Sequence, residues 1–159
     1  MFSLRQLEAR EKFSAGWAPD LLYFGACMDV LIGGKMALRY AIDKQQRLVL
    51  TNAEGCVTFD DVRGHQDRLL ADPEFDASFD QLIDTTLTTK LEVSTDQARI
   101  LAERRIVSPE SRRAMVATKP DIFGVGRMME VFHQNVGATE VQVFYSMDEA
   151  LQWLEKGEG

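Results

Sequence analysis

The chain has 159 residues, of which 45% are hydrophobic and 27% charged, a composition typical of a soluble globular domain with an adequate core. Its 25 acidic and 18 basic side chains give a net charge of −7, which argues against nucleic-acid binding because phosphate affinity requires a basic face. Cys27 and Cys56 form no CxxC pair, so the sequence indicates neither a disulfide framework nor a zinc site. Free thiols favour a cytoplasmic location.

Regular alternation of strand and helix patterns begins only at Met36, directly after Gly33-Gly34-Lys35. Codons for this junction have the form GGN GGN AAR ATG, which can contain a ribosome-binding sequence. One interpretation is that translation starts at Met36 and that residues 1–35 are upstream sequence; the other is a genuine N-terminal extension. Residues 17–32 are apolar, but Asp20 and Asp29 interrupt them and they fall short of the ~20 apolar residues of a membrane span. No stable membrane insertion is therefore expected.

The patterned region opens with a predicted β-hairpin followed by a helix. Residues 38–42 and 48–52 are strand-like runs separated by a polar connection, and Gly55 is expected to end the second strand. Residues 58–61, Thr-Phe-Asp-Asp, have the form of a capping box at a helix start. Asp72-Pro73 ends this helix, since the residue before proline is disfavoured in the helical region.

A central strand and a second capped helix come next. Residues 81–84 predict the strand, and threonine-rich and apolar steps follow it up to Val93. Residues 94–97, Ser-Thr-Asp-Gln, form another capping box, so Ser94 is expected at the N-cap of a helix that continues to about Arg105.

The last part of the chain predicts two further strand–helix pairs. Residues 113–117 and 140–145 are strand candidates, and Ser146 should cap a C-terminal helix. Between the two strands, Lys119-Pro120-Asp121 begins a longer helix. Its glycines, Gly124 and Gly126, do not complete a dinucleotide-binding GxGxxG and instead allow close approach to the sheet. Its apolar residues recur at steps of three and four: Ile122, Val125, Met129, Phe132 and Val136.

The resulting order, β-β-α-β-α-β-α-β-α, defines a small α/β domain and resembles the STAS domain of bacterial anti-sigma factor antagonists and sulphate-transporter tails. It is most similar to the divergent stand-alone SpoIIAA-like, or STAS/SEC14-like, bacterial group. The resemblance covers Met36 to Leu154 and is carried by the Glu54-Gly55 turn, the strand end at residues 82–84, the helix start at Ser94 and the strand–helix pattern of residues 143–154.

The resemblance implies one STAS-like domain over residues 36–159, with a mixed sheet of about five strands and helices mainly on one face. It also implies a non-enzymatic interaction or regulatory module that binds a protein partner. In anti-sigma antagonists a serine at the start of the corresponding helix is a phosphorylation switch. Ser94 and Thr95, followed by Asp96, occupy that place, but the family's Asp-Ser-Ser-Gly pattern is absent, and Ser94 as a simple helix cap is the alternative.

Charge is distributed unevenly along the chain. Acidic residues dominate residues 60–96, and the balance reverses over residues 99–127. Four arginines flank the loop at Ser108-Pro109 and are expected to gather at one edge, facing an acidic partner surface or a second copy of the chain; two solvated faces are the alternative. These arginines are Arg104, Arg105, Arg112 and Arg113.

No catalytic constellation stands out. His65 and His133 fall in different predicted helices without neighbours spaced as metal ligands or as a nucleophile–base pair, so surface or partly satisfied histidines are expected. The sequence predicts no catalytic residue, metal site or cofactor. The alternative function is a small-molecule or lipid-binding module with an apolar pocket beneath the helix of residues 122–136.

Overall fold

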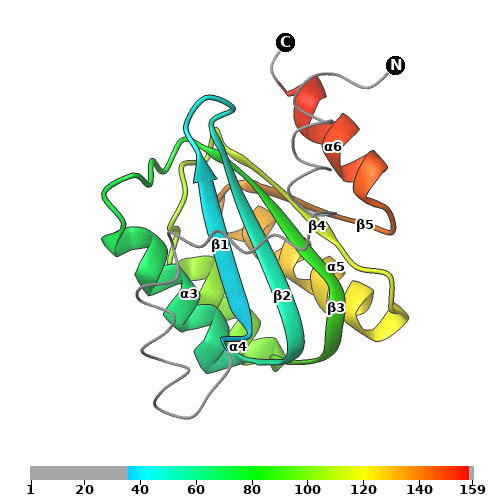
Figure 1. Ribbon diagram of the computed structural model, residues 1–159. Helices are drawn as coiled ribbons and strands as arrows, with labels where there is room; N and C mark the ends of the chain where they lie inside the picture. Colours follow the sequence, from blue (N-terminus) through cyan, green and yellow to red (C-terminus); the bar gives the residue numbers. More distant parts are fainter. Residues whose placement is uncertain (1–35, 158–159) are drawn as a thin grey trace. The chain divides into compact units, whose positions relative to one another are not determined.

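The structure is a computed structural model that describes residues 36–157 (Figure 1), so the predictions for residues 1–35 lie outside the described residues. The predicted order of elements is confirmed. The elements are β1 (Leu38–Asp43), β2 (Leu48–Thr58), α3 (Phe59–Ala71), β3 (Asp80–Glu92), α4 (Thr95–Glu103), β4 (Arg112–Val116), α5 (Pro120–Asn135), β5 (Glu140–Phe144) and α6 (Met147–Lys156).

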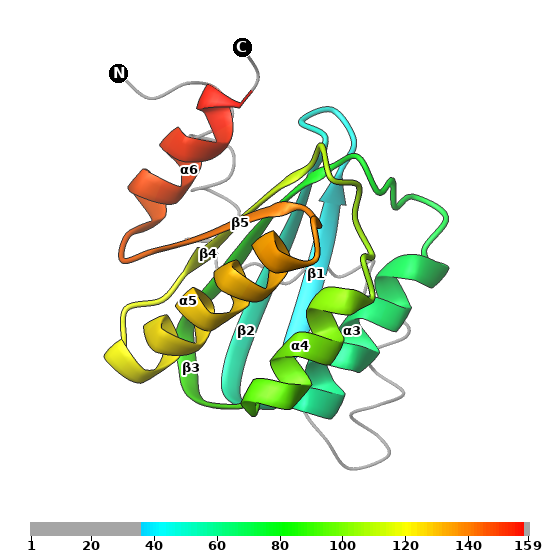
Figure 2. The same ribbon diagram turned by 180° about the vertical axis from the view of Figure 1, so that it is seen from behind.

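The strands form one mixed five-stranded sheet in which spatial order equals chain order, β1-β2-β3-β4-β5. β1 and β2 are an antiparallel hairpin, and every later pair is parallel. Each right-handed crossover connects a strand to its neighbour in the same direction across the sheet, from β2 toward β5. Crossovers of one handedness and one direction place their helices on the same face. Figure 2 shows α3, α4 and α5 in front of the sheet, which confirms the predicted arrangement of helices mainly on one face.

The C-terminal helix α6 packs on the opposite face, chiefly against β4. The ring centroids of Phe144 and Trp153 lie 5.6 Å apart at this contact. The guanidinium of Arg112 lies over the Trp153 ring, 3.7 Å from its centroid, and donates to the backbone carbonyl of Trp153. α6 is therefore joined to the sheet by both apolar and cation–π contacts.

The predicted helix starts are confirmed by their hydrogen bonds. Thr58 and Asp61 form a reciprocal capping box at α3, and Ser94 and Gln97 form one at α4. The hydroxyl of Ser146 accepts from the backbone N–H at the start of α6. These local signals fix where each helix begins, because each cap satisfies backbone donors that have no partner inside the helix.

The expected end of the second strand at Gly55 is wrong. Gly55 has φ +71°, a left-handed conformation that glycine adopts without strain, and β2 continues through it to Thr58. The register against β3 shifts between Asn52 and Glu54 and again between Gly55 and Cys56, so the strand is bulged and not ended. The central strand is longer than predicted for the same reason: β3 pairs with this extension as a single strand of 13 residues.

Close packing of α5 on the sheet depends on Gly126. A Cβ atom at this position would lie 2.8 Å from Cγ2 of Val143 and 3.3 Å from the sulfur of Met115. Carbon atoms do not approach so closely without displacement, so the helix axis is held at a distance that only glycine permits. The predicted close approach to the sheet is confirmed for Gly126 and is wrong for Gly124, where an added Cβ atom would meet nothing within 4 Å.

Candidate ligand-binding cavity

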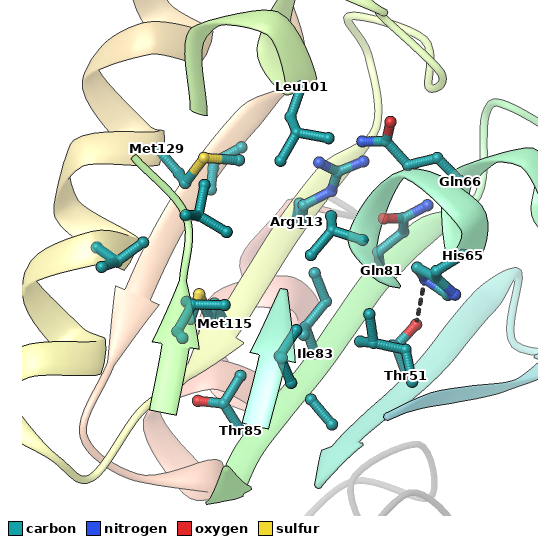
Figure 3. A pocket seen from close by; sticks show the side chains of 18 of the residues that line it. Thr51, His65, Gln66, Gln81, Ile83, Thr85, Leu101, Arg113, Met115 and Met129 are labelled. Atoms are coloured by element: carbon teal, nitrogen blue, oxygen red, sulfur yellow. Dashed lines mark hydrogen bonds between the residues drawn. The ribbon is translucent and has the colours of Figure 1, made fainter. Parts of the chain in front are cut away.

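A cavity of about 100 Å³ lies between the sheet and the helices α3, α4 and α5 (Figure 3). This volume is several times the ~10–15 Å³ that one water molecule needs. Because successive side chains of a strand point to opposite faces, alternate residues of the inner strands line it. From β2 these are Thr51, Ala53 and Val57, and from β3 they include Gln81, Ile83 and Thr85.

The cavity is polar at the amino ends of the parallel strands. Gln81 and Arg113 are direct neighbours in the register of β3 and β4, and both line the cavity. α3 contributes His65 and Gln66, and α5 contributes His133. In Figure 3 the side chains of Gln66 and Gln81 lie one above the other beside the Arg113 guanidinium.

The opposite end of the cavity is apolar. It is lined by Leu91 and Val93 at the carboxyl end of β3, by Val62 from the first turns of α3 and by Val125 from α5. These four side chains are partly exposed, whereas the polar residues at the other end are buried. The cavity therefore has a polar inner end and an apolar end that reaches toward the surface.

Arg113 is the cation of this site, and its side chain is 7% exposed. Within residues 36–157 no carboxylate forms an ion pair with it, and no Asp or Glu lines the cavity. Its Nη1 lies 3.4 Å from Nε2 of His133, while its Nε has no hydrogen-bond partner. Burial lowers the pKa of Arg113 to about 10, so the guanidinium is still charged at neutral pH.

Both histidines at the polar end are neutral at physiological pH. Burial, followed by the charges of Arg68 and Arg113, lowers the pKa of His65 to about 3. Burial and the charge of Arg113 lower the pKa of His133 to about 4. The Nδ1 of His133 lies 2.8 Å from the carbonyl of Met129 and donates to it, which leaves Nε2 to accept from Arg113. Neither ring competes with Arg113 for an anion.

Four buried polar atoms around this one cavity lack a hydrogen-bond partner. Two are donors, Nε of Arg113 and Nε2 of Gln81; the others are Oε1 of Gln66 and Nδ1 of His65. The other ring nitrogen of His65 lies 3.3 Å from the hydroxyl of Thr51. Native domains leave only a few such atoms unsatisfied, so four at one cavity indicate groups that await a partner.

The residues predicted as a switch lie at the start of α4. The hydroxyl of Ser94 accepts from the backbone N–H of Gln97 at 3.2 Å, which confirms its role as a helix cap. Thr95 and Asp96 are exposed, and Asp96 pairs with Arg99 at 3.4 Å. A switch or partner-binding role for Ser94, Thr95 and Asp96 stays a prediction.

The predicted cluster of four surface arginines is wrong. Arg112 and Arg113 are consecutive in β4 and therefore point to opposite faces, Arg112 to α6 and Arg113 into the cavity. Arg104 pairs with Asp67 of α3, and Arg105 donates to the backbone carbonyl of Val136. The four guanidinium groups thus have separate partners and do not form one charged edge.

The residues of the polar end were missed by sequence reasoning. The expected surface position is wrong for both histidines, because His65 is 6% and His133 3% exposed. The other expectation, a partly satisfied histidine, holds for His65, since only one of its ring nitrogens has a hydrogen-bond partner. The available signal was helical spacing: His65 lies three residues after Val62 and four before Leu69, and His133 four after Met129. Polar side chains on an otherwise apolar stripe are candidates for a buried site.

Within residues 36–157 no helix is long and apolar enough to cross a membrane. In the same part of the chain no group of three or more His, Cys, Asp or Glu side chains is arranged to hold a metal ion.

A mixed five-stranded sheet with helices mainly on one face and a C-terminal helix on the other defines a SpoIIAA-like fold. A similar solved structure is that of an uncharacterised protein of the DUF3478 family from Shewanella loihica PV-4, described as having this fold. The two chains are 18% identical, with a TM-score of 0.52 over 74% of this chain and 94% of the other. The fold predicted from the sequence is confirmed. No family model and no curated protein matches the sequence.

Proposed function

We propose that this chain is a ligand-binding regulatory module of SpoIIAA-like fold that holds a small, largely apolar molecule in the cavity beneath α3, α4 and α5. The observation that carries the proposal is the cavity itself, whose mainly apolar wall contains four unpaired buried polar atoms. Concave apolar sites with a few convergent polar groups are typical of small-molecule binding. An engineered cavity of ~150 Å³ binds benzene, so a ligand of comparable size or an extended one that reaches the apolar end suits this volume.

A protein-binding role is compatible with ligand binding through α4. Ser94, the predicted partner contact, caps the start of this helix, and Leu101 of the helix lines the cavity. A molecule in the cavity would touch α4 from within, while a partner would meet the exposed residues at its start. Ligand occupancy could thus alter partner affinity by favouring one position of the helix.

The proposal is tested by native mass spectrometry of the purified full chain, with extraction of any small molecule that co-purifies. Val93→Trp places a large ring at the apolar end of the cavity and should abolish the bound mass. Val131→Trp is the matched control, because Val131 lies on α5, is 52% exposed and does not line the cavity. Loss of the bound mass in both variants, or a wild-type chain that binds no small apolar molecule even when supplied, would contradict the proposal.

A further inference from the structure

We infer that the ligand of this cavity is an amphipathic carboxylic acid whose carboxylate pairs with Arg113 and whose apolar body lies toward Leu91 and Val93. This inference rests on the proposed function and adds the chemical class of the ligand. Its basis is the position of the only cation that lines the cavity in the described part of the chain. Arg113 stands at the buried end, without an acidic partner and with Nε unpaired.

The donors around Arg113 match a carboxylate in number and kind. A guanidinium presents planar N–H groups that bind the two oxygens of a carboxylate side by side. The unpaired Nε2 of Gln81 is a further donor at the neighbouring register position. One cation with adjacent neutral donors balances a single negative charge, whereas a phosphate dianion would leave charge uncompensated in a buried site.

The surroundings of Arg113 exclude a cationic ligand and disfavour a neutral one. His65 and His133 are neutral, and no carboxylate in the described residues lines the cavity to attract a positive group. A neutral apolar molecule would leave Nε of Arg113 and Nε2 of Gln81 buried and unpaired. An acid satisfies both donors and neutralises the buried charge. The same groups therefore raise the affinity of the cavity for an acid and lower its affinity for the neutral analogue.

The direction of the ligand follows from the two ends of the cavity. The polar groups lie at the amino ends of β3 and β4, and the apolar, partly exposed residues Leu91 and Val93 lie at the carboxyl end of β3. A straight-chain or aromatic acid can place its carboxylate inward and its tail outward. The reverse orientation would set the charge among valine and leucine side chains.

The experiment compares a matched acid and alcohol, octanoate and n-octanol, by calorimetric titration into the full chain at neutral pH. Wild type should bind octanoate at least about tenfold more tightly than octanol. Arg113→Met should reduce this preference to about one and should raise the melting temperature of the ligand-free protein by removing an unpaired buried charge. Arg63→Met, which removes an exposed arginine from α3, is the control for the change in net charge and should keep the preference.

Equal binding of acid and alcohol by wild type would overturn the carboxylate inference while leaving a ligand-binding cavity. Binding of neither would overturn both the inference and the proposed function. If Arg113→Met does not fold, NMR of the wild-type arginine side chains decides the matter. Octanoate should shift the Nε–H resonance of one buried arginine and octanol should not; an unchanged resonance with octanoate bound would overturn the assignment to Arg113.

Discussion

Arg113 and the two histidines show how burial alone changes the acid–base chemistry of a side chain. All three lie between sheet and helices, where desolvation disfavours their charged forms. The imidazoles give up their proton within the normal pH range, but the guanidinium, with its much higher starting pKa, does not. The result is a site with one fixed positive charge among neutral polar groups.

The histidines should make the stability of the fold depend on pH. An exposed histidine in the unfolded chain has a pKa of about 6.5, whereas the folded pKa of His65 is about 3. Between these values the unfolded chain binds a proton that the folded chain does not, so stability is fully present above about pH 6.5 and is lost as the pH falls toward 3. The expected slope is about 1.4 kcal/mol per pH unit for each histidine in this window.

Urea unfolding near pH 7 and near pH 5 measures this dependence. In wild type both histidines should lower the free energy of unfolding as the pH falls from 7 to 5. This fall should be about half as large in His65→Gln, which keeps a polar group beside Thr51. The other half should be absent from His133→Gln at any pH above about 4. If the free energy of unfolding of His65→Gln fell as steeply as that of wild type over this interval, His65 would not be neutral in the folded protein.

The cavity residues could not be predicted from the sequence, because neighbouring residues of a strand point to opposite faces of the sheet. The sequence does not show which of two neighbours points to which face. Arg112 and Arg113 are chemically identical neighbours, yet one stacks on Trp153 and the other enters the cavity. A shift of register by one residue would exchange them. An apolar pocket beneath the helix of residues 122–136 is the alternative that the sequence leaves open, and Val125, Met129 and His133 of α5 do line the cavity. The sequence does not show whether a helix carries more apolar side chains than the core can use.

At the scale of the elements, α5 provides a matched pair of glycines that separates tertiary packing from helix propensity. Gly126→Ala should destabilise the protein by about 1–3 kcal/mol, because its methyl group would overlap Val143 of β5. Gly124→Ala meets no atom within 4 Å and should stabilise it by about 0.4–1 kcal/mol through the greater helix propensity of alanine. Chemical denaturation of both variants provides the comparison.

Effects of the same sign in the two variants would show that α5 does not approach β5 as closely as described. The same substitution within one helix keeps side-chain chemistry and net charge constant, so only the surroundings differ.

Element positions were predictable where the signal is local. Capping boxes at Thr58 and Ser94 identified two helix starts, because the hydrogen bonds that make them involve residues only three apart. The end of β2 was not predictable in the same way. Gly55 signals a turn in isolation, but ten residues of pairing with β3 carry the strand through it, and such pairing depends on residues distant in sequence.

At the scale of the molecule, we propose that residues 36–159 form the folding unit. Every predicted capping box lies in this region, and its residues from Ala37 onward form one compact unit by their contacts. Removal of residues 1–35 should therefore leave a cooperative unfolding transition with a melting temperature within a few degrees of that of the full chain. Differential scanning calorimetry of the two proteins measures it; loss of cooperativity in the shorter chain would show that residues 1–35 belong to the unit.

The sheet has the same order in space as in the chain, and this has a consequence for its synthesis. Each strand pairs with the strand made just before it, so no later segment has to insert between strands that are already joined. The loop that must close for each new pairing spans one crossover helix, which limits its entropic cost. In a chain emerging from the ribosome, β1 to β4 can therefore pair in turn while β5 and α6 are still being synthesised. The exposed edge of the growing sheet is always the edge with which the next strand pairs.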